Sequence, residues 1–319
     1  MRLLFSVFAL ILSGFVHATP LDKIVVFGDS LSDNGNLYQL TEHFVPNSPP
    51  YYEGRFTNGP VWVEALAESY YHENSSAYLR DYAFGGASIS DDPRLPTLKN
   101  QIALYLNAHQ GKADENNLYI IWIGANNYVA MPNEDVDQTV AKVTMGIRAG
   151  VESLIKGGAK HFMLVNLPDL GITPMPKELF DDPDNPDKVD QVRELLSRYS
   201  NKHNDLLPQT VSDLKDANQG VDVLLFDANS EISHISAEGK FNNITQSCYA
   251  TRIDKPTANV SLQIAAKVKL PPTPNENLCK EFLFFDALHP TVKVHRLFAA
   301  KVKEFLTTNG IEFSSTTAG

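Results

Sequence analysis

The sequence has 319 residues, of which 43% are hydrophobic and 20% are charged, a composition typical of a globular protein with one large domain. Its formal charge of −11 argues against a nucleic-acid-binding protein and against tight electrostatic binding to an anionic membrane. The same charge is compatible with a neutral or zwitterionic amphiphile as substrate.

Residues 1–18 have the three parts of a secretory signal peptide. Arg2 provides the basic start, an apolar run follows from Leu3 to Val16, and Ala18 is the small residue after which we expect cleavage. The run is too short for a membrane-spanning helix. We therefore predict an exported chain, secreted or periplasmic. Loss of Arg2 would take its formal charge from −11 to −12. A buried N-terminal helix is the alternative.

Five apolar segments predict buried parallel strands, and they alternate with segments that have a helical pattern. The expected strands are residues 24–27, 78–84, 118–123, 161–166 and 221–226. The expected helices are residues 61–71, 98–108, 137–156, 192–207 and a last one that begins at Pro290. This alternation indicates a doubly wound α/β sheet with one core, formed by residues 19–313 and followed by a loose tail at 314–319.

Residues 33–59, after the first strand, form a long polar stretch with many Gly and Pro residues, which is typical of a functional loop. Tyr51, Tyr52 and Phe56 in this stretch either line a substrate groove or pack the loop against the body of the protein. The sequence favours neither reading over the other.

Residues 228–280 interrupt the alternation and contain the two cysteines of the chain, Cys248 and Cys279. In an exported protein such a pair favours a disulfide over two free thiols. We predict an excursion from the sheet that this disulfide closes. Because the excursion precedes Asp286 and His289, it is either a lid over the site, which a protease could activate by cutting it, or a structural staple.

Ser30 follows the first strand directly, after the break at Gly28 and Asp29. In open α/β sheets, ligands bind at the carboxyl ends of the strands, so a serine at this place is a candidate nucleophile. A turn or a helix N-cap is the alternative role for such a serine.

Two further strand ends carry candidate oxyanion donors. Gly85 and Gly86 follow the second strand, and Asn126 follows the third. Because these ends share one edge of a parallel sheet with Ser30, the backbone N–H groups of Ser30 and Gly86 and the amide of Asn126 are predicted to form an oxyanion hole. A tight turn at the glycines and a helix cap at Asn126 are the alternatives.

His289 is the candidate general base, because Asp286 lies three residues before it and Pro290 begins the last helix. A serine needs a base whose pKa lies near the working pH, and a carboxylate can orient and stabilise the imidazole. We predict Ser30, His289 and Asp286 as a catalytic triad. A helix cap built by Asp286 and Pro290 is the alternative.

These residues occur in four blocks and in an order that resembles the GDSL (SGNH) hydrolase family. The blocks are Gly28-Asp29-Ser30-Leu31, then Gly86, then Gly124-x-Asn126, then Asp286-x-x-His289. The segments 54–62 and 83–87 resemble the lipase-type branch, which includes secreted bacterial lysophospholipases A and glycerophospholipid:cholesterol acyltransferases. The resemblance implies a three-layer α/β/α fold of flavodoxin-like form, an acyl-serine intermediate, and neither a metal nor an organic cofactor.

The resemblance also implies a substrate and partners. We expect an esterase for lipid acyl esters, most of all lysophospholipids, with water or a sterol or other alcohol as acceptor and with transient contact to a membrane or micelle surface. A short-chain or carbohydrate acetyl esterase is the alternative enzyme, and a non-catalytic binding module is a third reading. A dehydrogenase is disfavoured because G-x-G-x-x-G does not follow the first strand. Asn127 stands where the family usually has Asp, so the firmness of the loop that aims Asn126 is in question.

Overall fold

The computed structural model describes residues 20–91, 96–132, 134–250, 260–267 and 278–314, so the predicted signal peptide lies outside the described residues. A five-stranded parallel sheet with the strand order β2-β1-β3-β4-β5 forms its centre. The strands are β1 (Lys23–Gly28), β2 (Leu79–Asp81), β3 (Asn117–Trp122), β4 (His161–Val165) and β5 (Asp222–Phe226). The predicted five-stranded parallel sheet is confirmed.

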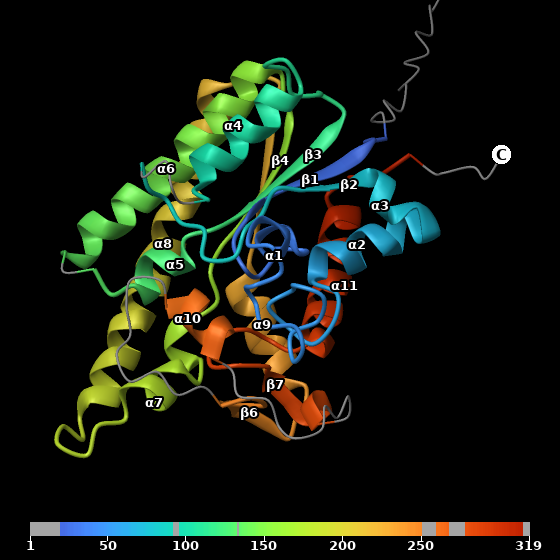
Figure 1. Ribbon diagram of the computed structural model, residues 1–319. Helices are drawn as coiled ribbons and strands as arrows, with labels where there is room; N and C mark the ends of the chain where they lie inside the picture. Colours follow the sequence, from blue (N-terminus) through green and yellow to red (C-terminus); the bar gives the residue numbers. More distant parts are fainter. Residues whose placement is uncertain (1–19, 92–95, 133, 251–259, 268–277, 315–319) are drawn as a thin grey trace, which may run out of the picture.

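Helices cover both faces of the sheet and make the three layers of the predicted fold (Figure 1). One face carries α2 (Trp62–Tyr71), α9 (Ala228–Ala237) and α11 (Val292–Thr308), which pack against one another. The opposite face carries α4 (Leu98–Ala108), α6 (Val136–Gly157) and α8 (Lys188–Ala217).

Shorter elements occupy the connections. They are α1 (Asn36–Leu40), α3 (Ser75–Tyr78), α5 (Ala125–Val129), α7 (Met175–Phe180), β6 (Asn243–Ser247), α10 (Val260–Lys267), β7 (Phe282–Phe284) and the 3₁₀ helices η1 (His72–Asn74), η2 (Leu170–Ile172) and η3 (Leu278–Glu281). Strands β6 and β7 pair with each other, away from the main sheet. Within the described residues, no helix combines the length and apolar character needed to span a bilayer.

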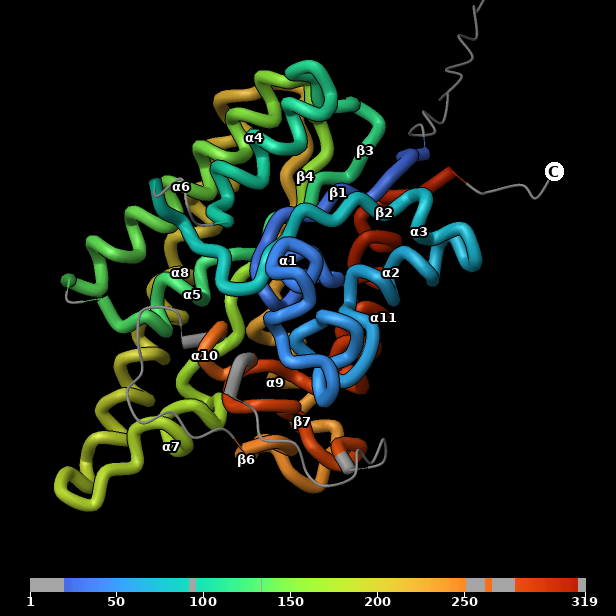
Figure 2. The backbone as a smooth tube through the Cα atoms, viewed as in Figure 1, coloured from blue at the N-terminus to red at the C-terminus, as the bar shows by residue number. Residues whose placement is uncertain are grey.

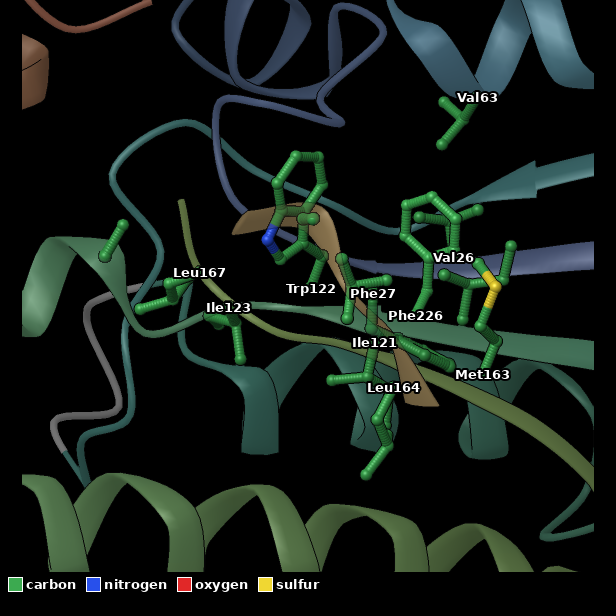
Figure 3. Close-up of a cluster of buried hydrophobic side chains, with 14 of the residues drawn as sticks. Val26, Phe27, Val63, Ile121, Trp122, Ile123, Met163, Leu164, Leu167 and Phe226 are labelled. Atoms are coloured by element: carbon green, nitrogen blue, oxygen red, sulfur yellow. The ribbon is translucent and has the colours of Figure 1, made fainter. Parts of the chain in front are cut away.

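The main core lies on both sides of β1 and β3, whose residues are almost all buried, as expected for central parallel strands. Figure 3 shows Ile121 of β3 beside Leu164 of β4, its partner in the register, on one face of the sheet, and Met163 near Val26 and Phe226 on the other face. On the α11 face, the ring of Trp122 stacks on Phe298 with their centroids 4.9 Å apart. The pairing of Gly28 with Trp122 ends β1 and β3 at the same level, so the residues that follow them share one edge of the sheet.

Two predicted elements differ from the observed ones. Helix α8 continues through Pro208 to Ala217, whereas the predicted helix ended at residue 207. Pro208 has no backbone N–H to donate within the helix. The burial of Leu207, Val211 and Leu214, on both sides of the proline, compensates for this loss. The second strand is shorter than the predicted 78–84, although the N–H groups of Tyr82 and Phe84 still bond to carbonyls of β1.

The predicted excursion at 228–280 begins with α9, which belongs to the helical layer, so the chain leaves the layers only after Ala237. Cys248 and Cys279 are joined by a disulfide with their Cα atoms 5.4 Å apart. In the predicted tail, Ser314 is held, because its N–H donates to the Leu21 carbonyl at 2.8 Å. Residues 315–319 lie outside the described residues.

Candidate active site

Ser30 lies in the first turn after β1 and is 4% exposed. Gly28 must be a glycine, since a Cβ there would lie 2.6 Å from the Trp122 carbonyl oxygen. The side chain of Gln101 on α4 holds both backbone groups of Gly28, accepting from its N–H at 2.9 Å and donating to its carbonyl at 2.8 Å. The strand end before Ser30 is therefore fixed. Sequence reasoning missed Gln101, because nothing local marks it.

His289 lies between Ser30 and Asp286. Its Nε2 lies 2.7 Å from the Ser30 Oγ, and its Nδ1 lies 2.7 Å from the Asp286 Oδ2. The carboxylate has a second task, because Oδ1 accepts the backbone N–H groups of Leu288 and His289 at 2.8 and 2.7 Å. Oδ1 thus forms the turn before His289 and Oδ2 orients the imidazole, whereas the N-cap of α11 is Thr291 and not Asp286, the alternative that the sequence left open.

The loop that carries Asp286 and His289 is held by strand-like bonds. The Phe285 N–H donates to the His289 carbonyl at 2.7 Å, and the Tyr249 N–H donates to the Phe285 carbonyl at 2.8 Å. On its other side, the Thr57 hydroxyl donates to the Pro290 carbonyl at 2.8 Å. Segments far apart in the sequence therefore fix the position of this loop.

A second hydrophobic cluster, separate from the main core, surrounds this loop. Its buried members are Leu37, Tyr51, Phe56, Tyr249, Ala265, Cys279 and Phe285. Of the three aromatic residues predicted for the 33–59 loop, Tyr51 and Phe56 are buried and pack the loop down, while Tyr52 is 39% exposed. The ring of Phe56 lies 5.3 Å from the His289 ring, centroid to centroid. The packing interpretation is thus correct for two of the three.

Two buried carboxyl groups near Ser30 have pKa values shifted in opposite directions. Burial alone would raise the pKa of Asp286, but the charge of His289 and hydrogen bonds from His289 and Tyr51 outweigh it and lower the pKa. For Asp29, burial dominates and raises the pKa to about 6, against a hydrogen bond from the Leu31 N–H. Asp286 is therefore the carboxyl that stays charged beside the imidazole.

Gly86 and Asn126 lie on neighbouring loops at the same sheet edge. Gly86 has φ = 73°, a conformation that favours glycine. The Asn126 Nδ2 donates to the Ala87 carbonyl at 2.8 Å, which fixes its amide beside Gly86. The Gly85 N–H in turn donates to the buried carboxylate of Asp33 at 2.7 Å, so the turn after β2 is tied to the loop after Ser30.

Asn127 makes a two-bond pairing with the backbone of Ile89. Its Oδ1 accepts the Ile89 N–H and its Nδ2 donates to the Ile89 carbonyl, both at 2.9 Å. An ionised aspartate could accept but not donate here. The residue that departs from the family pattern therefore ties the Asn126 loop firmly to the segment after Gly86.

The segment between the two cysteines reaches the predicted oxyanion turn. Its helix α10 packs against α5 (Figure 2), and a Cβ placed on Gly86 would lie 2.8 Å from the Leu262 Cγ. The Asn47 N–H donates to the Ala265 carbonyl of the same helix at 3.3 Å. Leu262 thus covers Gly86 in this structure.

A small apolar cavity opens beside Ser30, His289 and Asn126. Its volume is about 50 Å³, and Leu31, Trp122, Leu170, Ile232, Leu288 and Val294 are among the residues that line it. That is room for about one or two water molecules. A larger groove of about 1470 Å³ is lined by Tyr51, Tyr52 and Lys293, but neither Ser30 nor His289 lines it. The small cavity is therefore the one where acyl chemistry could occur.

The sequence is similar to known proteins over most of its length. The profile of the GDSL-like Lipase/Acylhydrolase family matches residues 24–302. The chain is 29% identical over 322 residues to a phosphatidylcholine-sterol acyltransferase of Aeromonas hydrophila, covering 89% of this chain and 90% of that one.

Two further bacterial relatives are longer than this chain. They are the secreted effector protein SseJ of Salmonella typhimurium, 28% identical, and the thermolabile hemolysin of Vibrio parahaemolyticus, 25% identical. Each match covers 89% of this chain and 63% of the relative.

Solved structures with a similar chain course include a G-D-S-L lipolytic protein of Veillonella parvula and an aryl esterase of M. smegmatis. The first is 14% identical with a TM-score of 0.45 and covers 89% of this chain and 98% of its own. The second is 16% identical with a TM-score of 0.47 and covers 90% of this chain and 99% of its own.

Proposed function

Because the chain belongs to the GDSL-like lipase/acylhydrolase family and is a carboxylic ester hydrolase, we propose that it is an exported serine esterase that acts on lipid acyl esters, lysophospholipids above all. The observation that carries the proposal is the continuous contact from the Ser30 Oγ through His289 to Asp286, with 2.7 Å at each step.

In the proposed reaction, His289 takes the proton from the Ser30 hydroxyl while the oxygen attacks the ester carbonyl. The charged Asp286 holds the imidazole in the tautomer with its proton on Nδ1 and stabilises the imidazolium that forms. His289 then gives the proton to the departing alcohol, and an acyl-serine remains. Water, or an acceptor alcohol, attacks this ester in the second half of the reaction.

The negative charge on the carbonyl oxygen needs preorganised donors. We assign this role to the backbone N–H groups of Ser30 and Gly86 and to the Asn126 amide, which lie on three loops of one sheet edge. The bonds of Asn126 to Ala87 and of Asn127 to Ile89 support the assignment, because they hold two of these loops together before substrate arrives.

A lipid substrate is supported by the apolar lining beside Ser30 and by the relatives named as acyltransferase and hemolysin. Acyl transfer to a sterol or another alcohol is the extension that the Aeromonas relative supports. The cavity of about 50 Å³ is too small for a long acyl chain as it stands. A long chain therefore requires the cavity to widen, and we propose that α10, whose Leu262 lies against Gly86, moves in that step as the lid formed by the disulfide-closed segment.

The small cavity specifically favours a second candidate, an esterase for acetyl or other short-chain esters. An acetyl group fits the space beside Ser30 without movement of α10. Contact with a membrane or micelle surface, and a protease that cuts between Cys248 and Cys279, belong to the lipid proposal alone, whereas export rests on the predicted signal peptide and applies to both candidates.

The test measures the release of fatty acid from lysophosphatidylcholine and phosphatidylcholine, and of acetate from a short-chain acetyl ester, by the wild type and by Ser30→Ala. Loss of the hydroxyl should lower kcat by at least about a thousandfold, with an unchanged melting temperature. Ser32→Ala is the matched control, because Ser32 is equally buried but its Oγ accepts from Trp62 and does not contact His289.

The outcomes separate the candidates. Rapid Ser30-dependent release from the lysolipid supports the lysophospholipase proposal. Turnover of the acetyl ester alone replaces it with the short-chain esterase. Full activity of Ser30→Ala would remove the triad from both.

A further inference from the structure

The Asp286 carboxylate of the proposed triad accepts a hydrogen bond that the reaction above does not use. The hydroxyl of Tyr51 donates to the Asp286 Oδ2 at 2.5 Å. This is the same oxygen that the His289 Nδ1 contacts at 2.7 Å. Tyr51 and Asp286 are 235 positions apart in the sequence, so neither local motif announces the contact.

The ring of Tyr51 is held rigidly in the second hydrophobic cluster. It is 2% exposed and packs edge-on against Phe285 and Phe56, with centroid distances of 5.0 and 6.1 Å. Its backbone N–H donates to the Asn47 carbonyl at 3.3 Å. A buried aromatic ring with these neighbours has few orientations, so its hydroxyl is directed at Asp286.

We propose that Tyr51 is a positioning residue for Asp286 and His289. It fixes the Asp286 carboxylate and shares the Oδ2 of that carboxylate with the imidazole of His289. The inference rests on the proposed triad. By donating to Oδ2, Tyr51 withdraws part of the negative charge that would otherwise bind the imidazolium.

The surroundings of Tyr51 keep its hydroxyl protonated, and therefore able to donate to Asp286. Burial and the neighbouring Asp286 carboxylate raise the pKa of Tyr51 well above its ordinary value, so the phenol keeps its proton throughout the working range. Among the residues that the structure describes, Asp29, after β1, and His295 on α11 are also electrostatically coupled to His289. Both are the same in the wild type and in a Tyr51 variant, so a difference between the two reports on Tyr51.

The experiment is the pH dependence of kcat/KM for Tyr51→Phe on the substrate that the wild type turns over. Without the phenol, Asp286 holds the imidazolium more tightly, so the acid limb should move to higher pH by about half a unit to one unit. Activity on that limb should then fall about threefold to tenfold, through kcat and with little change in KM.

Tyr249→Phe is the matched control. Tyr249 is in the same cluster, its ring lies 5.1 Å from that of Phe285, and none of the hydrogen bonds described for Asp286 comes from it. Its loss should leave the acid limb in place. A purely structural role for Tyr51 would lower activity or the melting temperature equally at every pH and would leave the limb unmoved.

An unmoved acid limb in a folded Tyr51→Phe, while Ser30→Ala is inactive, overturns this inference and leaves the triad standing. Activity in Ser30→Ala removes the triad itself, which is a different result. If Tyr51→Phe does not fold, 3-fluorotyrosine at position 51 takes its place. The fluorinated phenol is a stronger donor of similar shape, so the acid limb should move to lower pH, and a limb that stays in place overturns the inference.

Discussion

The two halves of the candidate site are built from different parts of the molecule. Ser30, Gly86 and Asn126 follow β1, β2 and β3, so the main sheet and its core position them. Asp286 and His289 follow β7, outside the main sheet, and the second hydrophobic cluster with its disulfide positions them. The nucleophile and the proposed oxyanion hole thus depend on the main fold, whereas the Asp286–His289 pair depends on the second cluster in addition to the main core, which includes the neighbouring Leu283, Phe284 and Ala287.

The difference extends to the electrostatics of the two halves. On the sheet side, the carboxyl of Asp29 is buried with little compensation, and its pKa is raised to about 6. On the cluster side, Asp286 is buried as deeply, but His289 and Tyr51 compensate the charge and its pKa is lowered. Burial penalises both charges, and of the two only Asp286 has enough compensation, from the charge of His289 and from its hydrogen bonds, to outweigh that penalty.

After Ser30→Ala, the largest expected effect comes from Gly86→Ala, which acts on the half of the site that the main sheet positions. At φ = 73° an alanine is strained, and its Cβ would lie 2.8 Å from the Leu262 Cγ. The turn must move, so we expect kcat to fall about a hundredfold or more as an oxyanion donor is lost. Steady-state kinetics and a melting curve measure both consequences.

Gly220→Ala is the control, because Gly220 has φ = 79° but a Cβ there meets nothing within 4 Å. It should lose about 1–2 kcal/mol of stability and no activity. A Gly86→Ala protein with wild-type kcat would show that this turn contributes no donor.

A smaller effect should follow from removing the disulfide with the double replacement Cys248→Ser and Cys279→Ser. This change acts on the half of the site that the second hydrophobic cluster positions. The free energy of unfolding should fall by about 2–4 kcal/mol. We expect kcat to fall about tenfold, since Cys279 is buried in the cluster that positions Asp286, and small displacements of catalytic groups are costly.

Reductant should have the same effect on the wild type and none on the double variant. If kcat stays at the wild-type value while stability falls, the cluster keeps Asp286 in place without the disulfide. An increase in kcat would instead favour the lid role of α10.

The last effect concerns stability alone and is a change in its pH dependence, in the half of the site that the main sheet positions. Because the folded-state pKa of Asp29 is raised from 3.8 to about 6, the folded protein binds its proton more tightly than the unfolded chain does. The stabilisation is complete below about pH 4 and is lost as the pH rises through about 6, at a cost of about 3 kcal/mol.

Asp29→Asn removes this loss. Urea unfolding should show the variant more stable than the wild type at pH 8 and no more stable at pH 4. Equal slopes of stability against pH in the two proteins would contradict the raised pKa of Asp29.

Local patterns were enough to predict the sheet, the order of the motifs and the contact of Ser30 with His289. Apolar runs that end in glycine mark parallel strand ends, and these ends must meet at one edge. The prediction was less accurate where packing outweighs propensity, as at Pro208 inside α8. Tyr51 was predicted only as a groove or packing residue, and its bond to Asp286 was missed.

The sequence by itself determined which residues could do the chemistry, because strand, turn and motif are properties of neighbouring positions. Only the tertiary structure decided how they are held. The bonds of Gln101 to Gly28 and of Tyr51 to Asp286, and the contact of Leu262 with Gly86, each join segments distant in the chain. Such contacts depend on the way in which the long loops fold onto the sheet, and the spacing of residues along the chain does not predict it.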